Sequence, residues 1–168
     1  MGNNWKITDT LTKVFADEVP DGQGSIRLST LHRETVSCVI AYFGAADWGR
    51  YWKVSVKAPE KIETRLRRVE LVPSAYPCHK EQDDNYLRIV PGMYPDLLRD
   101  LDTEDDGADK KYLTKEVPGQ WRSLWLDVTV DAELAGGDYA IVIETETEDG
   151  EKETLKADLH VVDASLPP

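Results

Sequence analysis

The C-terminal third of the chain, from Trp121 to Pro168, reads WRSLWLDVTVDAELAGGDYAIVIETETEDGEKETLKADLHVVDASLPP. In three segments of it, apolar side chains alternate with polar ones, which is typical of strands with one buried face. The expected inward-facing residues are Leu124, Leu126, Val128 and Val130, then Tyr139, Ile141 and Ile143, and finally Leu155, Ala157, Leu159 and Val161. Gly136-Gly137 separates the first two segments, and Asp149-Gly150, a strong hairpin signal, separates the last two. The stretch therefore predicts three consecutive antiparallel strands.

Four further strand patterns precede this stretch. They cover Ser25–Leu31, Val36–Phe43, Trp52–Val56 and Ile62–Val72. The second is apolar almost throughout, as expected for a strand buried on both faces. In the third, Trp52 shares a face with Val54 and Val56, so we expect Trp52 in the core. In the fourth, the alternation changes phase at Arg67-Arg68, which predicts a β-bulge there.

The region from Pro73 to Gly119 has no sustained periodicity, and only Tyr86–Val90 within it resembles a strand. A connection of this length is usually functional, packed on itself or inserted. Roughly seven to nine short strands without helical periodicity predict an all-β, antiparallel β-sandwich, Ig-like or jelly-roll-like, with a long irregular inter-strand loop. Leu166-Pro167-Pro168 is typical of a linker. We therefore predict a single sandwich domain over residues 1–163 and the start of a linker over 164–168.

The chain has 168 residues and a formal net charge of −12, from 20 basic and 32 acidic side chains. This charge argues against nucleic-acid binding, which needs a basic face against phosphate repulsion. The nearest basic group, formed by Arg65, Arg67 and Arg68, is too small for that purpose. No apolar run approaches the roughly 20 residues of a membrane span. We expect no nucleic-acid or membrane partner.

Two cysteines and the N-terminus bear on location. Cys38 lies inside an apolar strand pattern and is expected to be a buried thiol, whereas Cys78 lies in a polar segment. A disulfide between them stays open, although two cysteines do not make a disulfide scaffold, and the reduced state is favoured. The N-terminal residues lack the apolar core of a signal peptide. Together these features favour a cytoplasmic protein.

Aromatic residues are the first candidates for a binding site, because exposed rings stack on the apolar faces of sugars. Trp48 is the best candidate for an exposed ring, and with Tyr51 it forms a candidate carbohydrate or interdomain surface. Trp125 points away from the face of Leu124 and Leu126, so the long loop or another domain is expected to cover it. The alternative is that these rings fill the core.

The acidic segment Asp100–Asp109 is the second candidate site. On a Ca²⁺-loop template, Asp102, Glu104 and Asp106 fall at ligand positions, but Leu113 occupies the position of the required terminal glutamate. We therefore favour a solvated loop. His32, His79 and His160 share no ligand spacing, and Cys78-His79 has no second pair for zinc. No cofactor is expected.

Arg33-Glu34 follows directly on the Ser25–Leu31 strand pattern. A charged pair at such a strand end is more typical of a structural ion pair or a loop cap than of acid–base catalysis.

Several motifs, taken in order, resemble one known family. They are Ser29–Glu34 followed by Val36–Cys38, Tyr94–Leu98, Leu124–Val130, Ala135–Tyr139 and Val161–Pro167. Their order and spacing resemble the N-terminal β-sandwich domain of bacterial glycoside-hydrolase-like proteins related to glycoside hydrolase family 123. The family often carries a glutamine a few residues after the glutamate, where this chain has Cys38-Val39.

The resemblance implies that catalysis resides elsewhere. In such proteins the catalytic acids lie in a (β/α)8 barrel that follows the sandwich, so no catalytic residue is carried over to this chain. The chain is then a non-enzymatic accessory domain that packs against and supports its own C-terminal barrel in a glycoside hydrolase, with Trp48, Tyr51, Trp125 and Tyr94 as candidate surface residues. The alternatives are a carbohydrate-binding module, with a glycan as ligand, and a generic protein-interaction sandwich.

Overall fold

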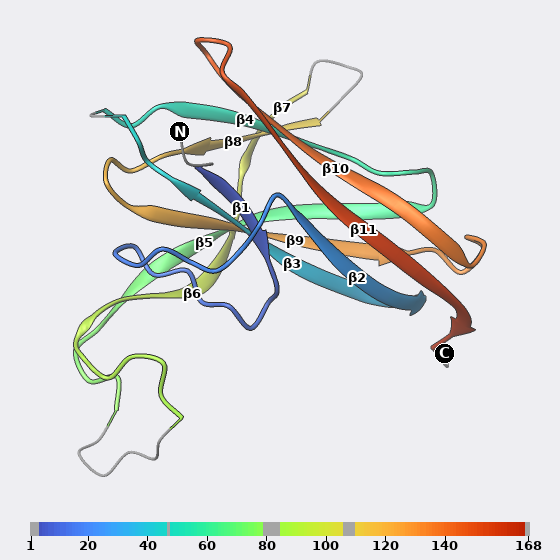
Figure 1. Cartoon of the computed structure of the whole chain (residues 1–168), viewed down its shortest axis with the longest axis horizontal. Helices are drawn as coiled ribbons and strands as arrows, with labels where there is room; N and C mark the ends of the chain where they lie inside the picture. The colour runs from blue at the N-terminus through green and yellow to red at the C-terminus, as the bar shows by residue number, and fades with distance from the viewer. Residues whose placement is uncertain (1–3, 47, 79–84, 106–109, 167–168) are drawn as a thin grey trace.

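Two β-sheets packed face to face make up the chain in a computed structural model, which describes residues 4–46, 48–78, 85–105 and 110–166 (Figure 1). Sheet 1 has the order β1 (Trp5–Thr8), β3 (Thr35–Phe43), β9 (Trp121–Val130), β5 (Ile62–Ser74), β6 (Gly92–Asp100). Sheet 2 has the order β2 (Ser25–His32), β11 (Lys152–Ser165), β10 (Gly137–Thr147), β4 (Tyr51–Lys57), β8 (Lys110–Lys115), β7 (Asp102–Asp105). All neighbouring strands are antiparallel except β2 and β11. The predicted antiparallel β-sandwich is confirmed.

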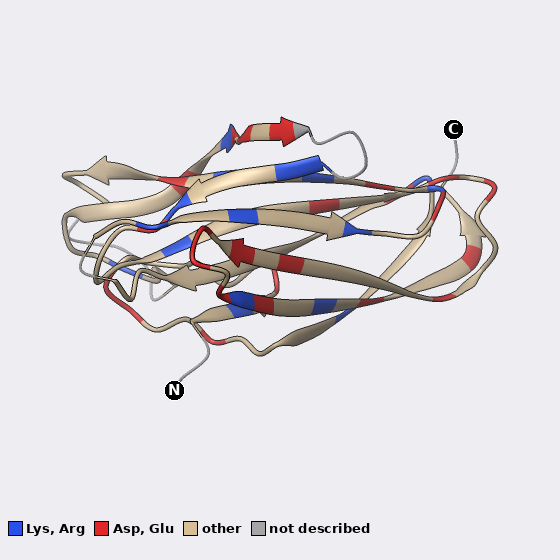
Figure 2. Cartoon of the chain, turned by 90° about the horizontal axis from the view of Figure 1, so that it is seen from above, with Lys and Arg blue, Asp and Glu red and all other residues tan. Residues whose placement is uncertain are grey.

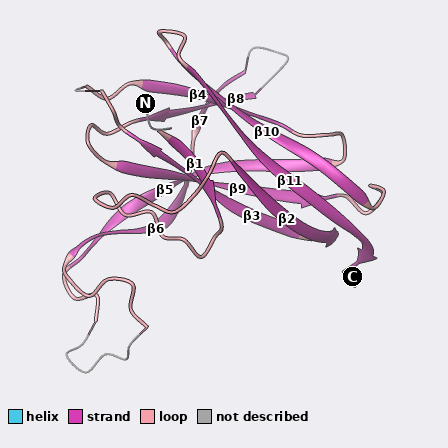
Figure 3. Cartoon of the chain, viewed as in Figure 1, coloured by secondary structure: helices cyan, strands magenta, loops and turns pink. Residues whose placement is uncertain are grey.

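The described ranges contain strands, turns and loops but no helix (Figure 3). Accordingly, they hold no helix that is long and apolar enough to cross a membrane.

The last three strands have the predicted inward-facing residues. On β9 and β11 these side chains are almost fully buried, and on β10 Ile141 and Ile143 are buried while Tyr139 packs against the core. Between β10 and β11, the amide of Gly150 donates a 3.0 Å hydrogen bond to the carbonyl of Thr147. The φ of Gly150 is +83°, a conformation that favours glycine, and the predicted hairpin is confirmed. Strand β11 continues through Ser165, two residues beyond the predicted domain end at Asp163.

Strand β1 was not predicted, yet it closes one end of the core. Its Trp5 is 1% exposed, stacks on Tyr42 with ring centroids 4.8 Å apart, and meets Trp52 edge-on at 5.2 Å. Trp52 is itself 1% exposed, so its predicted place in the core is confirmed. The three rings form an aromatic cluster between the sheets.

A second, smaller core lies outside sheet 1. The segment 9–24 crosses the outer face of that sheet (Figure 1), and Val14 from this segment is buried with Val39, Ala41 and Trp121. Because β3 is covered on both sides, its nearly continuous apolar run is explained, and burial on both faces is confirmed.

The predicted bulge at Arg67-Arg68 is wrong. Strand β5 pairs with β9 without interruption from Ile62, opposite Val130, to Val69, opposite Ser123. The register shift lies further along, between Glu70 and Leu71 in the pairing with β6. The alternation changes phase for two reasons. Val69 is apolar because it lies on the outer face of the sheet, which is buried at this point. Arg68 and Glu70 are polar because the inner face opens into a cleft there.

The expectation of a long irregular loop over Pro73–Gly119 is also wrong. This region contributes β6, β7 and β8, whereas Tyr86–Val90 is not a strand. Strands β6 and β7 lie at the edges of their sheets, where side chains are exposed and the alternation of apolar residues is lost. Pro95 fits this placement, since proline is tolerated on an edge strand.

The outer face of sheet 2 is ionic. Lys53 pairs with Glu104, Lys57 with Glu144, and Lys156 with Asp158. Figure 2 shows basic and acidic residues interspersed along the strands. Such partly exposed pairs contribute little to stability, but they keep this face hydrated.

The two cysteines are free thiols, so the disulfide between them is excluded. Cys38 is fully buried in β3, as predicted, and Cys78 is partly exposed. Burial, with a smaller contribution from the charge of Asp127, raises the pKa of Cys38 to about 12. The thiol of Cys38 therefore stays protonated at neutral pH.

This difference predicts the thiol chemistry of the native protein. At about pH 8, Cys78 should react with Ellman's reagent within minutes, whereas Cys38 should react only after denaturant is added, because the thiolate is the nucleophile. Counting thiols before and after unfolding checks the expectation. The Cys78→Ser variant should show no fast-reacting thiol, and rapid reaction of two thiols in the native wild type would contradict the assignment.

Candidate functional site

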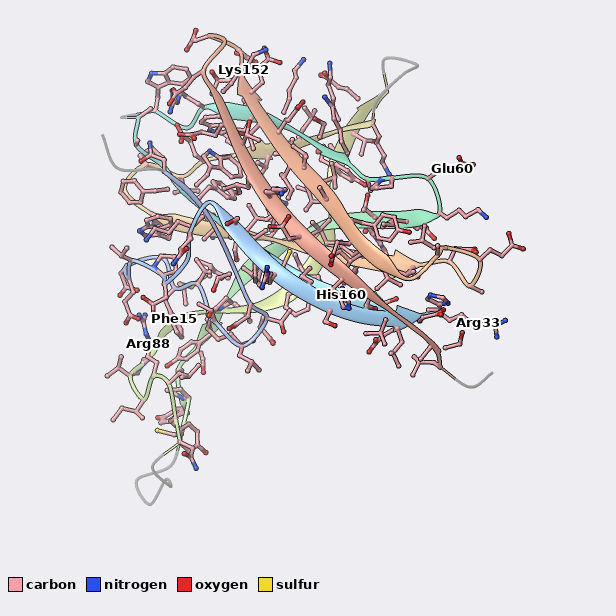
Figure 4. The ribbon with its side chains drawn as sticks, turned by 45° about the vertical axis from the view of Figure 1, so that its right-hand side comes forward. Phe15, Arg33, Glu60, Arg88, Lys152 and His160 are labelled. Atoms are coloured by element: carbon pink, nitrogen blue, oxygen red, sulfur yellow. The ribbon has the colours of Figure 1, made fainter. Side chains whose placement is uncertain are left out.

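The loop between β3 and β4 lies at the end of the sandwich remote from the last described residues. At one end, the amide of Leu166 donates a 3.2 Å hydrogen bond to the carbonyl of His32. Strand β3 starts beside that point at Thr35 and runs to Phe43, so the following loop with Trp48 is at the other end. In Figure 4, Arg33 of the β2–β3 turn lies on the opposite side of the view from Phe15 and Arg88.

Trp48 and Tyr51 are both exposed at this remote end, with 59% and 48% of their surface accessible. Tyr51 begins β4, and Lys115 of β8 places its ammonium 5.1 Å from the centre of the Tyr51 ring. Within the described part of the chain, neither Trp48 nor Tyr51 stacks on another ring. The two side chains are therefore available to a ligand, but they do not form a flat stacked platform.

A buried carboxylate fixes the loop at its base. Glu116 is 1% exposed and accepts a 2.8 Å hydrogen bond from Nε of Arg50. The amide of Glu116 also donates to the carbonyl of Arg50 at 3.0 Å, and Nε1 of Trp52 lies 3.5 Å from the carboxylate. Arg50 additionally pairs with Glu151 of the β10–β11 hairpin. Hydrogen bonding to Glu116 raises the pKa of Arg50, so this guanidinium remains charged.

Two glycines allow the chain around this loop to approach the segment after β8. A Cβ on Gly44 would lie 2.1 Å from the carbonyl oxygen of Val117. A Cβ on Gly49 would lie 2.6 Å from the carbonyl oxygen of Glu116 and 2.8 Å from Cε of Lys115. Since real Cβ atoms do not come this close, both positions require glycine.

A cleft of about 420 Å³ opens between the two sheets beside this loop. Its polar lining consists of Tyr42, Arg68, Glu70, Lys115, Glu116 and Arg122. Arg122 is the ladder partner of Tyr42, and Arg68 is the ladder partner of Leu124, so both start from the inner face of sheet 1. We call this site the mouth cleft, because it is where the sandwich interior meets solvent.

Two groups in the mouth cleft have unusual surroundings. The Nε atom of Arg122 is buried and has no hydrogen-bond partner. The hydroxyl of Tyr42 lies 2.8 Å from Oγ1 of Thr114, and burial raises the pKa of Tyr42, so the phenol stays neutral. The cleft therefore offers cationic donors around a neutral phenol.

Sequence reasoning missed this cleft, although a signal was present. Arg122 precedes Leu124 by two residues, and Arg68 and Glu70 follow Leu66 in steps of two. Charged residues in phase with a buried face indicate that the face opens to solvent at that point.

Trp125 and Tyr94, the other two candidate surface residues, lie on the outer side of sheet 1 and not beside Tyr51. Trp125 is half-buried, and its Nε1 donates a 2.7 Å hydrogen bond to Asp127. Tyr94 meets Phe15 of the 9–24 segment edge-on at 5.7 Å, and its hydroxyl donates to the carbonyl of Val90 at 2.6 Å. Both side chains are therefore engaged in contacts within the domain.

Two of the three acidic candidates, Asp102 and Glu104, lie among the described residues. Asp102 and Glu104 belong to strand β7, so the expectation of a loop is wrong there, and Glu104 pairs with Lys53 at 2.8 Å. Asp106 lies outside the described residues. Within the described ranges, no group of three or more His, Cys, Asp or Glu side chains could hold a metal ion.

Arg33-Glu34 forms a loop cap, which confirms that alternative. The carboxylate of Glu34 accepts hydrogen bonds from the amide of Leu31 at 2.7 Å and from Oγ1 of Thr30 at 3.2 Å. Arg33 has a φ of +63°, and its amide donates to the carbonyl of Val130 at 2.9 Å. The β2–β3 turn is thus held by its own side chains.

The arginines proposed as a small basic group are each engaged. Arg65 pairs with Asp100, Arg67 with Asp127, and Arg68 with Glu70.

Comparison with known proteins relates the fold to solved structures. No family model and no curated protein matches the chain. A family 123 glycoside hydrolase from Clostridium perfringens, studied for glycolipid glycan hydrolysis, aligns with a TM-score of 0.66 at 10% identity. The alignment covers 97% of this chain and 28% of that chain, so this chain spans little more than a quarter of the hydrolase.

Two other structures are similar at lower TM-scores. The N-terminal domain of PorA gives 0.46 at 7% identity, covering 96% of this chain and 99% of that chain. A PapD-like domain of human CEP192 gives 0.39 at 9% identity, covering 98% and 92%. The relation to the family 123 hydrolase is thus one of fold: the chain is a small all-β domain and not a catalytic barrel.

Proposed function

We propose that the chain is a non-catalytic accessory domain of a glycoside-hydrolase-like protein and packs against a (β/α)8 catalytic barrel. The observation that carries this proposal is the alignment of 97% of the chain with 28% of a family 123 glycoside hydrolase. A sandwich of this size leaves most of such a hydrolase for other domains. In this role the chain contributes interface area and a shaped surface, while the barrel carries the chemistry.

An exposed apolar arm supports packing along sheet 1. We define the arm as residues 75–78 and 85–93, which include the first two residues of β6 and otherwise connect β5 to β6; the arm projects from the body in Figure 1. The arm exposes large side chains, namely Tyr76, Tyr86, Leu87, Ile89, Val90 and Met93. Arg88 holds its base against the 9–24 segment through Asp17 and Glu18, and its guanidinium lies 3.8 Å from the centre of the Phe15 ring. Since the outer face of sheet 2 is ionic, the apolar arm is the better interface.

Hydrogen exchange tests the accessory role. The coding sequence beyond Pro168 should continue into a barrel, and in that longer protein the amides of residues 85–93 should exchange at least about tenfold more slowly than in the isolated chain. The β10–β11 hairpin at Gly150, which is closed by its own backbone hydrogen bonds and lies away from Leu166, serves as the reference. An immediate stop codon, or unchanged exchange over the arm, would overturn the proposal.

Carbohydrate binding at the remote end is a second candidate function, favoured by the exposure of Trp48 and Tyr51 beside a cleft. We expect the Trp48→Ala variant to lose at least about tenfold in affinity for a saccharide bound at millimolar concentration, because stacking on the ring is removed. Titration calorimetry measures the affinity. Tyr86→Ala, which removes an exposed aromatic ring on the arm, is the control and should bind normally. Absence of saccharide binding by the wild type would overturn this candidate.

A further inference from the structure

We propose that the mouth cleft binds the acidic group of an anionic saccharide, with Arg122 and Lys115 as its ligands and Tyr51 beside the sugar ring. This inference rests on the carbohydrate-binding candidate and adds the class of sugar. It concerns a carboxylate or sulfate ester on the saccharide, since both present oxygen atoms to a cation in the same way.

The cleft lining has more basic than acidic side chains. It includes three basic side chains, Arg68, Lys115 and Arg122, and two acidic ones. Both acids are engaged, since Glu116 pairs with Arg50, and Glu70 pairs with Arg68 at 2.6 Å. Among the residues that the structure describes, Lys115 and Arg122 are therefore the cations at the cleft without a carboxylate partner. In a chain with a net charge of −12, such a cationic site is a local exception.

The guanidinium of Arg122 has a donor, the buried Nε, that lacks a hydrogen-bond partner in the described part of the chain. Arg122 lines the cleft, and its buried Nε has no acceptor among the described residues, so this guanidinium has donor capacity that the protein itself leaves unused. A guanidinium presents two parallel donors that match the oxygen pair of a carboxylate or sulfate. Arg122 starts from the inner face of sheet 1, opposite Tyr42, so a paired strand places its side chain at the cleft.

The exposed rings of Tyr51 and Trp48 lie beside the cationic side of the cleft and favour a sugar as the ligand. The ammonium of Lys115 lies 5.1 Å from the centre of the Tyr51 ring, so a ligand whose acid group reaches Lys115 extends toward that ring. Gly49 lines the cleft, which places the exposed Trp48 one residue from it. The cleft volume of about 420 Å³ lies within the roughly 300–1,000 Å³ typical of small-molecule sites.

Matched ligands test the proposal. Methyl glucuronide and methyl glucoside differ only in the carboxylate at C6, and glucose 6-sulfate supplies the sulfate form. By titration calorimetry, the glucuronide or the 6-sulfate should bind at least tenfold more tightly than the glucoside, and the better of the two identifies the source of the charge. The advantage should shrink as salt is raised, because charge attraction is screened.

Matched variants assign the site. Arg122→Gln and Lys115→Gln should each remove most of the advantage of the acidic ligand, so that the affinity for the glucuronide falls to about that for the glucoside. Arg99→Gln, which removes an exposed arginine 3.9 Å from Glu70, should change neither affinity. Melting curves confirm that each variant is folded, and Lys115, an exposed residue, provides a usable variant if Arg122→Gln is unstable.

The outcomes separate this inference from the function on which it rests. Equal binding of glucuronide and glucoside by the wild type overturns the acidic site but leaves carbohydrate binding standing. If none of the glucuronide, the glucoside and glucose 6-sulfate binds, both the acidic site and the carbohydrate-binding function are overturned. Acetate binding as tightly as the glucuronide would show that the cleft takes small acids and would overturn the role of the sugar ring.

Discussion

The Trp5→Ala variant is expected to lose about 4 kcal/mol of the free energy of unfolding, within the range for truncating a buried tryptophan. Trp5 is 1% exposed, and it contacts both Tyr42 and Trp52 through its ring. Removing the indole leaves a cavity between these rings, which cannot collapse because Tyr42 and Trp52 belong to two different sheets. For a domain of this size, the melting temperature should fall by roughly 10 °C.

Urea unfolding followed by tryptophan fluorescence or circular dichroism measures this loss. Trp48→Ala is the matched control, because it removes the same side chain from a position that is 59% exposed, and it should change stability by no more than about 0.5 kcal/mol. If the alanine variant does not fold, Trp5→Phe keeps an aromatic ring and should lose roughly 1–2 kcal/mol. Equal losses for Trp5→Ala and Trp48→Ala would show that β1 is not part of the core.

There is a physical reason why strands β9, β10 and β11 were predicted residue by residue, whereas β1 was missed. A strand buried on one face shows its orientation in the sequence, as Leu124, Leu126 and Val128 do, because every second side chain must be apolar. Strand β1 has four residues, too few for a periodic pattern, and it is held by pairing with β3. The long-range pairing that places Trp5 beside Tyr42 cannot be inferred from local sequence.

The edge strands β6 and β7 were not predicted because their side chains are largely exposed. Strand β6 exposes Met93 and Leu97, and β7 has an exposed Asp102, so neither strand shows a clean buried face. Their position depends on β5 and β8, which provide the hydrogen-bonding partners. Where a strand is stabilised mainly through its backbone, side-chain patterns carry little information.

The candidate site was only partly predictable, because it joins residues from both sheets. The exposure of Trp48 follows from its polar, glycine-containing loop, and the cap at Glu34 follows from its place at a strand end. The mouth cleft depends on the register that sets Arg122 opposite Tyr42, and this register is a tertiary property. The change in the apolar alternation at Arg67-Arg68 results from the opening of the cleft, but a β-bulge would produce the same change in sequence.

Removing the buried carboxylate at the base of this site should also have a large effect. Glu116→Gln is expected to cost about 3 kcal/mol, since removing one partner of a buried ion pair typically costs 3–5 kcal/mol. The lower end applies because Arg50 is partly exposed and retains Glu151 as a partner. The same change weakens the loop that carries Trp48, so quenching of tryptophan fluorescence by acrylamide should increase.

Glu151→Gln is the control, because it removes the other carboxylate that pairs with Arg50 from a position where the side chain is 45% exposed. This exposed pair should contribute no more than about 1 kcal/mol. The double variant Arg50→Met with Glu116→Leu should lose less than the sum of the single changes, since it leaves no unpaired charge buried beside Trp52. If Glu116→Gln and Glu151→Gln cost the same, the energy of the pair lies in surface attraction, and the loop at Trp48 is held instead by the close approach of Gly44 and Gly49 to residues 115–118.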